Sequence, residues 1–253
     1  MKKLFYFIKK NYFLLIFAFL IVFVSFVSFY RLFNNKQTYI YVKVKLGQGL
    51  WWAATAEPPS WLINSIKKAS DSDNKLPVKV LRVQYYPYFT SGVNNQFVDQ
   101  YNTYLTLKLK VTEGKNSNHY YFNRSIIAIG APIDLELSDV QISGTVVSFS
   151  KKPINDQYIE KTIYLTKESP FLWEYEAIKA GDYYFDGENK VFQVVNKEIS
   201  ENGSVLTVKG KIKLKEVNNQ LVFAEDKVIA PGKNINIITN HFSFNNYIVS
   251  RIE

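Results

Sequence analysis

Residue types that carry out most enzyme chemistry are scarce in this chain. Among its 253 residues there are two histidines, His119 and His241, and no cysteine. Without thiols, a disulfide framework and thiolate metal sites are excluded. The two histidines do not have the paired helical spacing of zinc ligands. We interpret both as surface residues, and we expect no metal site and no histidine-based catalytic triad.

Paired carboxylates offer another route to catalysis, because they cleave glycosidic bonds in many hydrolases. Asp134 and Glu136 are two residues apart, so they share one face of a strand. Acids that alternate along a half-exposed strand usually face solvent, and we assign these two no catalytic role. Gly47-Gln48-Gly49 lacks the third glycine and the helix of a dinucleotide site. The sequence therefore predicts no catalytic residue and no cofactor.

Clustered aromatic residues are the remaining candidates for a site. Stacking on a glycan or a partner chain is one interpretation, and packing in a sheet is the other. Adjacent residues of a strand point to opposite faces, so one ring of each pair must leave the inner face of its own sheet. We expect a neighbouring element to cover that second ring, and exposure would mark an interface. The clusters are Trp51-Trp52, residues 85–89 and residues 183–185.

The N-terminal part of the chain contains a segment with the apolar character of a transmembrane helix. Residues 12–30 read YFLLIFAFLIVFVSFVSFY and carry no charge. Nineteen helical residues would cover roughly 28 Å, close to the hydrocarbon thickness of a bilayer. The exit, SFVSFYRLF, lacks the small residues of a signal-peptide cleavage site, so we expect an uncleaved anchor in the lipid bilayer.

Charge around this segment predicts its orientation. Residues 1–11 contain four lysines and no acid, whereas Arg31 and Lys36 are the only basic residues that closely follow the segment. The positive-inside rule then places residues 1–11 in the cytoplasm, as a tail, and the rest of the chain outside it. Five of the nine net positive charges lie in residues 1–31, so the remainder is too weakly basic for a nucleic-acid partner.

Alternating hydrophobicity dominates the chain beyond a polar stalk at residues 31–37. Aliphatic residues alternate with lysines in residues 39–45, 104–111 and 205–214, which is typical of strands with one buried face. Two short helices are predicted, one after Pro58-Pro59 with Ser60 as its N-cap, and one with Ser169 as its N-cap and Pro170 as its first residue. The fold class is therefore mainly β, with a few short helices after the anchor.

An internal repeat organises this β region. Trp61 and Ile66 match Trp173 and Ile178 at an offset of 112, and Gly130 matches Gly232 at an offset of 102. We predict a tandem duplication, 38–150 and 157–253, joined by residues 151–156, with each copy forming a barrel-like or sandwich-like β structure. Each tryptophan is expected to plug one end of its copy, above the matching isoleucine. The matched pattern continues through Ile133/Ile235, Leu135/Ile237, Val140/Phe242, Ile142/Phe244, Val146/Ile248 and Val147/Val249.

The glycine-centred blocks also resemble a known family. Residues 125–138 with 143–147, and residues 226–240 with 244–249, are similar to the C-terminal part of bacterial domain-of-unknown-function family 4330. Gly130-Ala131-Pro132 fits that pattern, whereas Pro231 precedes Gly232 in the second copy. The resemblance implies one N-terminal transmembrane helix and an extracytoplasmic β domain, and it implies no activity.

Together these features favour a non-enzymatic module for envelope assembly or protein–protein contact. The candidate structural or interaction residues are Trp51, Trp52, Trp61, Trp173, Gly130 and Gly232. A glycan binder or carboxylate-based hydrolase acting on cell-wall polymer is one alternative. An adaptor subunit of a transport or secretion complex is another, and it would predict homo-oligomers.

The predicted orientation is directly testable. Protease added to spheroplasts or intact protoplasts should remove residues beyond about 35 and spare a tag at the N-terminus, because only the tail is expected in the cytoplasm. Immunoblotting for tags at both ends reads out the result. Protection of the C-terminal tag would reverse the predicted orientation.

Overall fold

The computed structural model describes residues 12–33, 37–47, 57–72, 77–88, 100–114 and 119–253. They belong to two compact units, one formed by residues 1–38 with 110–126 and the other by 39–109 with 127–253. Among the described residues, no helix qualifies as long and apolar enough to span a membrane.

The first unit contains helix α2, Tyr12–Phe33, and a small hairpin. The side chains described in α2, at Phe13, Ile16, Phe17 and 19–27, are all exposed. The helix continues into the predicted stalk, of which only 34–36 lie outside the described residues. In the hairpin, Tyr120 and Phe122 are buried and the two turn residues have positive φ. The hairpin strands are β4, Tyr120–Phe122, and β5, Ser125–Ile127, which follow the end of β3, Tyr101–Glu113.

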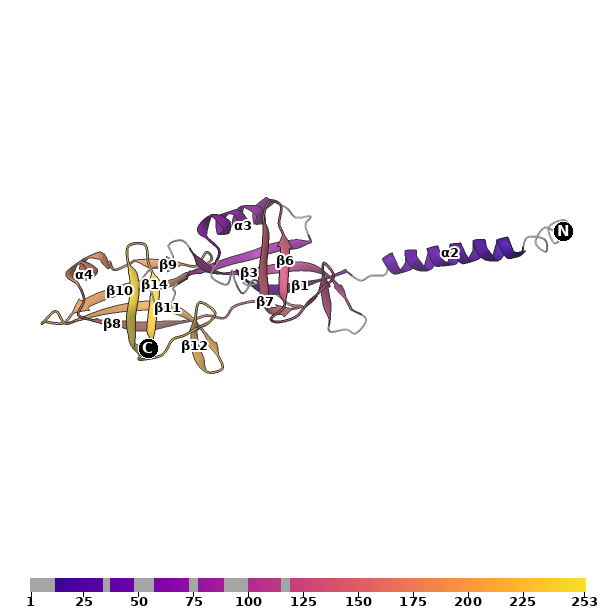
Figure 1. Ribbon diagram of the computed structural model, residues 1–253. Coiled ribbons are helices and arrows are strands. Elements are labelled where there is room, and N and C mark those ends of the chain that lie inside the picture. Colours follow the sequence, from indigo (N-terminus) through magenta and orange to yellow (C-terminus); the bar gives the residue numbers. More distant parts are fainter. Residues whose placement is uncertain (1–11, 34–36, 48–56, 73–76, 89–99, 115–118) are drawn as a thin grey trace. The chain divides into compact units, whose positions relative to one another are not determined.

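Two barrel-like sheets make up most of the chain (Figure 1). The first has the strand order β5-β4-β3-β1-β7-β6, with β2 paired to β3. The second has the order β13-β12-β11-β8-β15-β14, with β10 paired to β11 and β9 to β10. The bounds not yet given are β1 Gln37–Leu46, α3 Ser60–Ser72, β2 Val78–Pro87, β6 Pro132–Glu136, β7 Gln141–Ser150, β8 Ile159–Glu168, α4 Leu172–Ala177, β9 Tyr183–Phe185, β10 Lys190–Ile199, β11 Val205–Val217, β12 Gln220–Phe223, β13 Lys227–Val228, β14 Asn234–Ile238 and β15 Ser243–Ile252.

The two strand orders are the same, which bears out the repeated architecture. Strands β1 to β7 correspond to β8, β10, β11, β12, β13, β14 and β15, and β9 is an addition in the second copy. In both copies the short helix follows the first strand. All three predicted alternating segments are strands, and their aliphatic face is buried, as at Leu107 and Val208. Residues 151–156 contain no strand or helix.

The glycine turns of the two copies share conformation and hydrogen bonds. Gly130 and Gly232 both have φ of +83°, a left-handed conformation that favours glycine. Gly130 N donates to Val146 O at 2.8 Å, and Gly232 N donates to Val249 O at 2.7 Å. This agreement confirms the predicted correspondence of the two turns.

The hydrogen bonds also correct the predicted register of the last strand. They equate Val146 with Val249, one residue beyond the match inferred from the sequence. Val146 and Val249 are buried, whereas Ile248 is 40% exposed. The extra residue lies at Asn246, which has φ of +58° and whose N–H donates to Asn236 Oδ1. The predicted pairs Val146/Ile248 and Val147/Val249 are therefore wrong, because a β-bulge absorbs an insertion there.

The two helices differ from prediction at their starts. Ser60 is itself the first residue of α3, so it is not the N-cap. The second helix, α4, begins two residues later than predicted, with Phe171 as its N-cap. There Glu174 Oε2 accepts a hydrogen bond from Phe171 N, and its side chain also contacts Lys167. A buried glutamate, rather than a serine hydroxyl, therefore fixes the start of α4.

The tryptophans of these helices do not plug the barrels. Trp61 is 65% exposed and Trp173 is 58% exposed, whereas Ile66 and Ile178 are completely buried. Ile66 lies within α3 and Ile178 is the C-cap of α4, and both are in the core, whereas the tryptophans near the helix starts are mostly exposed. The predicted packing role of Trp61 and Trp173 is wrong, while that of the two isoleucines is confirmed. Trp173 stacks on the equally exposed Phe171, with 6.3 Å between ring centroids.

Stability measurements separate these two roles. Ile178→Ala should lower the free energy of unfolding by about 2–4 kcal/mol, because it leaves a cavity in the core. Trp173→Ala should lower it by no more than about 1 kcal/mol, since over half of its surface is already in water. Chemical denaturation of both variants, followed by circular dichroism, provides the comparison. Equal losses would show that Trp173 is a core residue after all.

Candidate functional site

A buried aspartate organises the contact between strands of the two repeats. Asp186 is completely buried just after the end of β9. Its Oδ2 accepts hydrogen bonds from Tyr86 Oη at 3.0 Å and Gln84 Nε2 at 3.1 Å, both on β2. Its Oδ1 accepts the backbone N–H groups of Glu188 and Asn189. These bonds satisfy the carboxylate and hold β2 of the first repeat against the β9 turn of the second.

Two tyrosine rings held in this way form the floor of a pocket. The hydroxyl of Tyr184 donates to Tyr85 O at 2.6 Å, and that of Tyr86 donates to Asp186. The Tyr86 ring lies edge-on to Phe223, with 5.7 Å between ring centroids. Tyr86, Tyr184 and Phe223 are all buried, so their positions are fixed by packing as well as by hydrogen bonds. The aromatic floor is therefore preformed.

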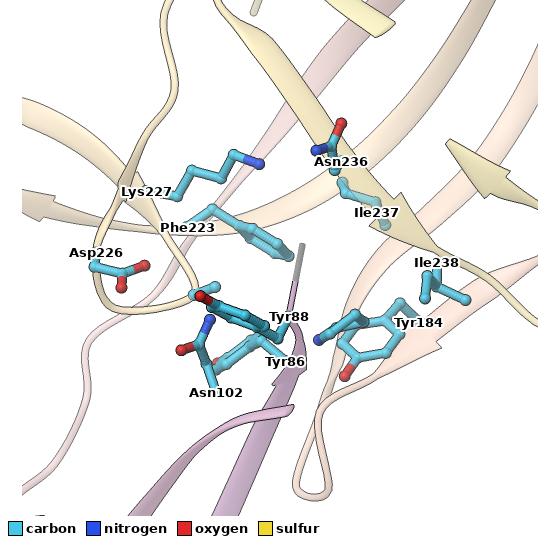
Figure 2. Close-up of a pocket in the computed structure, with 12 residues that line it drawn as sticks. Tyr86, Tyr88, Asn102, Tyr184, Phe223, Asp226, Lys227, Asn236, Ile237 and Ile238 are labelled. Atoms are coloured by element: carbon cyan, nitrogen blue, oxygen red, sulfur yellow. The ribbon is translucent and has the colours of Figure 1, made fainter. Parts of the chain in front are cut away.

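The pocket above this floor has a volume of about 240 Å³ and a mixed rim (Figure 2). Figure 2 shows Asp226 and Lys227 on one side of it, with Ile237 and Ile238 on the other. The remaining lining residues are Pro87, Tyr88, Asn102, Ala224 and Asn236. An apolar floor with a few convergent polar groups is the usual composition of a ligand site.

Burial changes the acid–base properties of groups at the pocket. It raises the pKa of Tyr86 far above the usual range of a phenol, and the neighbouring Asp186 charge acts in the same direction. It lowers the pKa of Lys227, although the Asp226 charge partly opposes this. The floor is therefore uncharged, and the charges that a ligand can meet are those of the rim.

Beside the pocket, a cluster of charged side chains joins the repeats. We call it the charge cluster, and its members are Lys43, Arg82, Asp156, Lys215 and Glu225. Lys43 Nζ lies 2.8 Å from Glu225 Oε1 and 3.2 Å from Asp156 Oδ2. Lys215 Nζ lies 2.7 Å from Asp156 Oδ1 and also contacts Glu225. Strands of both repeats and the linker residue Asp156 thus meet in one ion-pair network.

The cluster holds one ammonium group almost out of water. Lys43 is 3% exposed, and burial lowers its pKa even though Glu225 and Asp156 favour its charged form. Burial also opposes the charge on Lys215, but Glu225 and Asp156 outweigh it and raise the pKa of Lys215. For Asp156 the effect of burial is outweighed by the two lysines, so its pKa is lowered. The opposite charges in the cluster therefore favour the ionised forms of these three groups and act against the effect of burial.

Glu225 reaches this cluster from a strained turn. Ala224 and Glu225 connect β12 and β13 with φ of +54° and +75°, in the left-handed region. Such turns favour asparagine and glycine, and other residues adopt them at a cost of about 1–3 kcal/mol each. In the corresponding turn of the first repeat, Asn123 and Arg124 also have positive φ, of +45° and +69°. The strained residues of the second repeat place Glu225 in the cluster and Ala224 at the pocket.

Most residues singled out in the sequence lie elsewhere. Trp51 and Trp52 lie outside the described residues. Trp61 and Trp173 are exposed on helices, and Gly130 and Gly232 form turns. None of these four lines the pocket.

The predicted aromatic clusters contribute in part. Tyr86, Tyr88 and Tyr184 line the pocket, while Tyr85 is half-buried and Phe185 is 43% exposed. We expect a neighbouring element to cover the second ring of each aromatic pair, and the exposed ring of Phe185 departs from that expectation. Sequence reasoning missed Asp226, Lys227 and Asn236, since nothing local distinguishes them from other polar turn and strand residues.

The polar residues considered for chemistry are placed as surface groups. His119 and His241 are exposed, and His241 Nδ1 lies 2.7 Å from Asp182 Oδ1. Asp134 and Glu136 both face outward from β6. Among the described residues, no three His, Cys, Asp or Glu side chains are grouped so as to hold a metal ion. Of the described residues that line the pocket, only Asp226 is a carboxylate.

Comparison with known proteins does not assign this site to a family. No protein-family model, no curated protein and no solved structure matches the chain.

The charge cluster generates a pH-dependent prediction. Because folding lowers the pKa of Asp156, its stabilisation is present above its unfolded pKa of about 4 and is lost as pH falls through the folded value. Asp156→Asn should therefore cost about 3 kcal/mol at pH 7, since it leaves buried lysines without a counter-charge. Urea unfolding from pH 7 to pH 3 should show this difference shrinking as the pH falls. A difference that does not change with pH would mean that charge is not its source.

Proposed function

We propose that this protein is a membrane-anchored, extracytoplasmic β module that binds a partner of the cell envelope and does not catalyse a reaction. The observation that carries the proposal is the pocket, which has a preformed aromatic floor and a polar rim and is built by both repeats. Binding at this pocket is compatible with a role in envelope assembly or protein–protein contact.

The anchor part of the proposal rests on the N-terminal sequence. Residues 12–30 carry no charge and lie within a 22-residue helix. Apolar side chains that stay exposed along a helix need an apolar environment, and a bilayer provides one. The excess of lysines before the helix supports a cytoplasmic tail and an outer β region.

Binding without catalysis is supported by the acid–base groups at the pocket. A glycosidase needs two carboxylates across the scissile bond, about 5–10 Å apart. Asp226 is the only carboxylate among the lining residues that the structure describes. The neighbouring Glu225 contacts Lys43 and Lys215 and does not line the pocket. The arrangement suits recognition better than hydrolysis.

Glycan binding is the second candidate, and the tyrosines favour it. Sugar rings stack on aromatic faces, and Tyr88 is a half-buried ring of the lining. A volume of about 240 Å³ accommodates one ring or one large side chain, so it does not separate a glycan from a peptide. The two candidates differ in the chemistry of the ligand and share the same pocket.

The pocket is tested by removing one ring. Tyr88→Ala should weaken capture of an envelope partner by the full chain in native membranes about tenfold, because it removes part of the contact surface. Tyr121→Ala is the matched control, since Tyr121 is an exposed tyrosine that does not line the pocket. Quantitative mass spectrometry after chemical cross-linking reads out the partner, and isolated cell-wall glycan replaces it in a second assay. Equal capture by both variants would remove the pocket from the function.

A further inference from the structure

The two repeats differ in how they protect the last edge of their sheets. Strand β6 is the outer strand of the first sheet, and β14 holds the same place in the second. Strand β6 reads PIDLE and β14 reads NINII. Proline and outward charges prevent an edge strand from pairing with another chain. The first repeat therefore has these protections at Pro132, Asp134 and Glu136, and the second has none of them at the matching residues.

The unprotected edge borders the pocket. Strand β14 pairs with β15 on one side, and it has no strand partner on its other side among the described residues. The short strand β9 lies close to part of β14, and just beyond β14 Tyr183 N donates to Asn240 Oδ1 at 3.3 Å. Asn236, Ile237 and Ile238 of β14 all line the pocket. Backbone groups that can extend a sheet therefore lie next to a preformed aromatic floor.

We propose that the edge of β14, which has no strand partner among the described residues, binds an extended peptide segment of the partner, which adds a strand to the second sheet. This inference rests on the proposed binding function and names the chemistry of its ligand. In such recognition the main-chain hydrogen bonds supply affinity, and pockets for alternate side chains supply specificity. One large apolar side chain of the segment enters the pocket above Tyr86, Tyr184 and Phe223.

The neighbouring side chains are compatible with an added strand. Asn236 is partly exposed, and its Oδ1 is already bonded to Asn246 N at 3.0 Å, so it does not compete for the incoming backbone. Asp226 and Lys227 have opposite charges, so the rim does not select a segment of one net charge. The side chain that enters the pocket is therefore the main determinant of the segment.

The sequence difference between the repeats supplies matched variants. N236D/I238E gives β14 the acids of β6, and the carboxylate that N236D introduces would still offer an oxygen to Asn246 N. D134N/E136I makes the reverse change on β6, a strand that contributes no residue to the pocket lining. The probe is a linear ten-residue peptide selected from a random library on the full chain in detergent. N236D/I238E should weaken its binding about tenfold, as the loss of one or two backbone hydrogen bonds would. D134N/E136I should leave binding unchanged.

Backbone methylation of the peptide separates strand addition from side-chain binding. Two versions of the selected peptide carry N-methyl groups at alternate residues, in opposite registers. One register removes the N–H groups that face β14, and it should weaken binding about tenfold or more. The other removes N–H groups that face away, and it should have little effect. Fluorescence anisotropy of a labelled peptide gives both affinities, and thermal melts confirm that the protein variants are folded.

The outcomes distinguish this inference from the proposed function. Equal effects of the two methylation registers, with binding still lost in Tyr88→Ala, would keep the pocket and overturn the added strand. The added strand would also be overturned if every selected peptide still bound the Tyr88→Ala variant. Concentration-dependent self-association that competes with the peptide would identify a second copy of the chain as the occupant instead. Register-dependent loss in the monomeric protein is the supporting result.

Discussion

The burial of the Lys43 ammonium is the constraint on which much of this structure depends. A lysine that is only 3% exposed keeps its charge only when opposite charges and hydrogen bonds compensate its lost hydration. Neither compensating carboxylate belongs to the first repeat, because Asp156 lies in the linker and Glu225 in the second repeat. The completed first barrel therefore requires the second. Asp186 adds to this dependence by accepting hydrogen bonds from Tyr86 and Gln84 of the first repeat.

Much of the β architecture was predictable because one face of each strand is buried. Burial enforces a period of two, and that period is visible in residues 104–111 and 205–214. The duplication was visible for a related reason. Turns that need a left-handed residue preserve glycine, so Gly130 and Gly232 provided a fixed reference for aligning the copies. The buried Ile66 and Ile178 followed from the same alignment.

The remaining features depend on contacts that have no local signature. A short helix with its C-cap can bury either the tryptophan or the isoleucine, and the covering strands decide which, so the predicted positions of Trp61 and Trp173 are wrong. Ala224-Glu225 lacks the asparagine or glycine that favours such a turn, and the ion pairs of Glu225 hold it in the charge cluster. The pocket combines residues of β2, β3, β9, β12, β13 and β14, which are brought together only in the folded chain. Insertion of a residue at Asn246 shifted the apparent alignment by one.

The charge cluster also has a consequence for the order of events during synthesis. Lys43 is made about 180 residues before Glu225, which at ribosomal speeds is a delay of roughly 10–40 s. During that interval its ammonium has no counter-charge from the second repeat and stays hydrated. We therefore expect strand β1 to reach its final burial only once the β12–β13 turn has supplied Glu225.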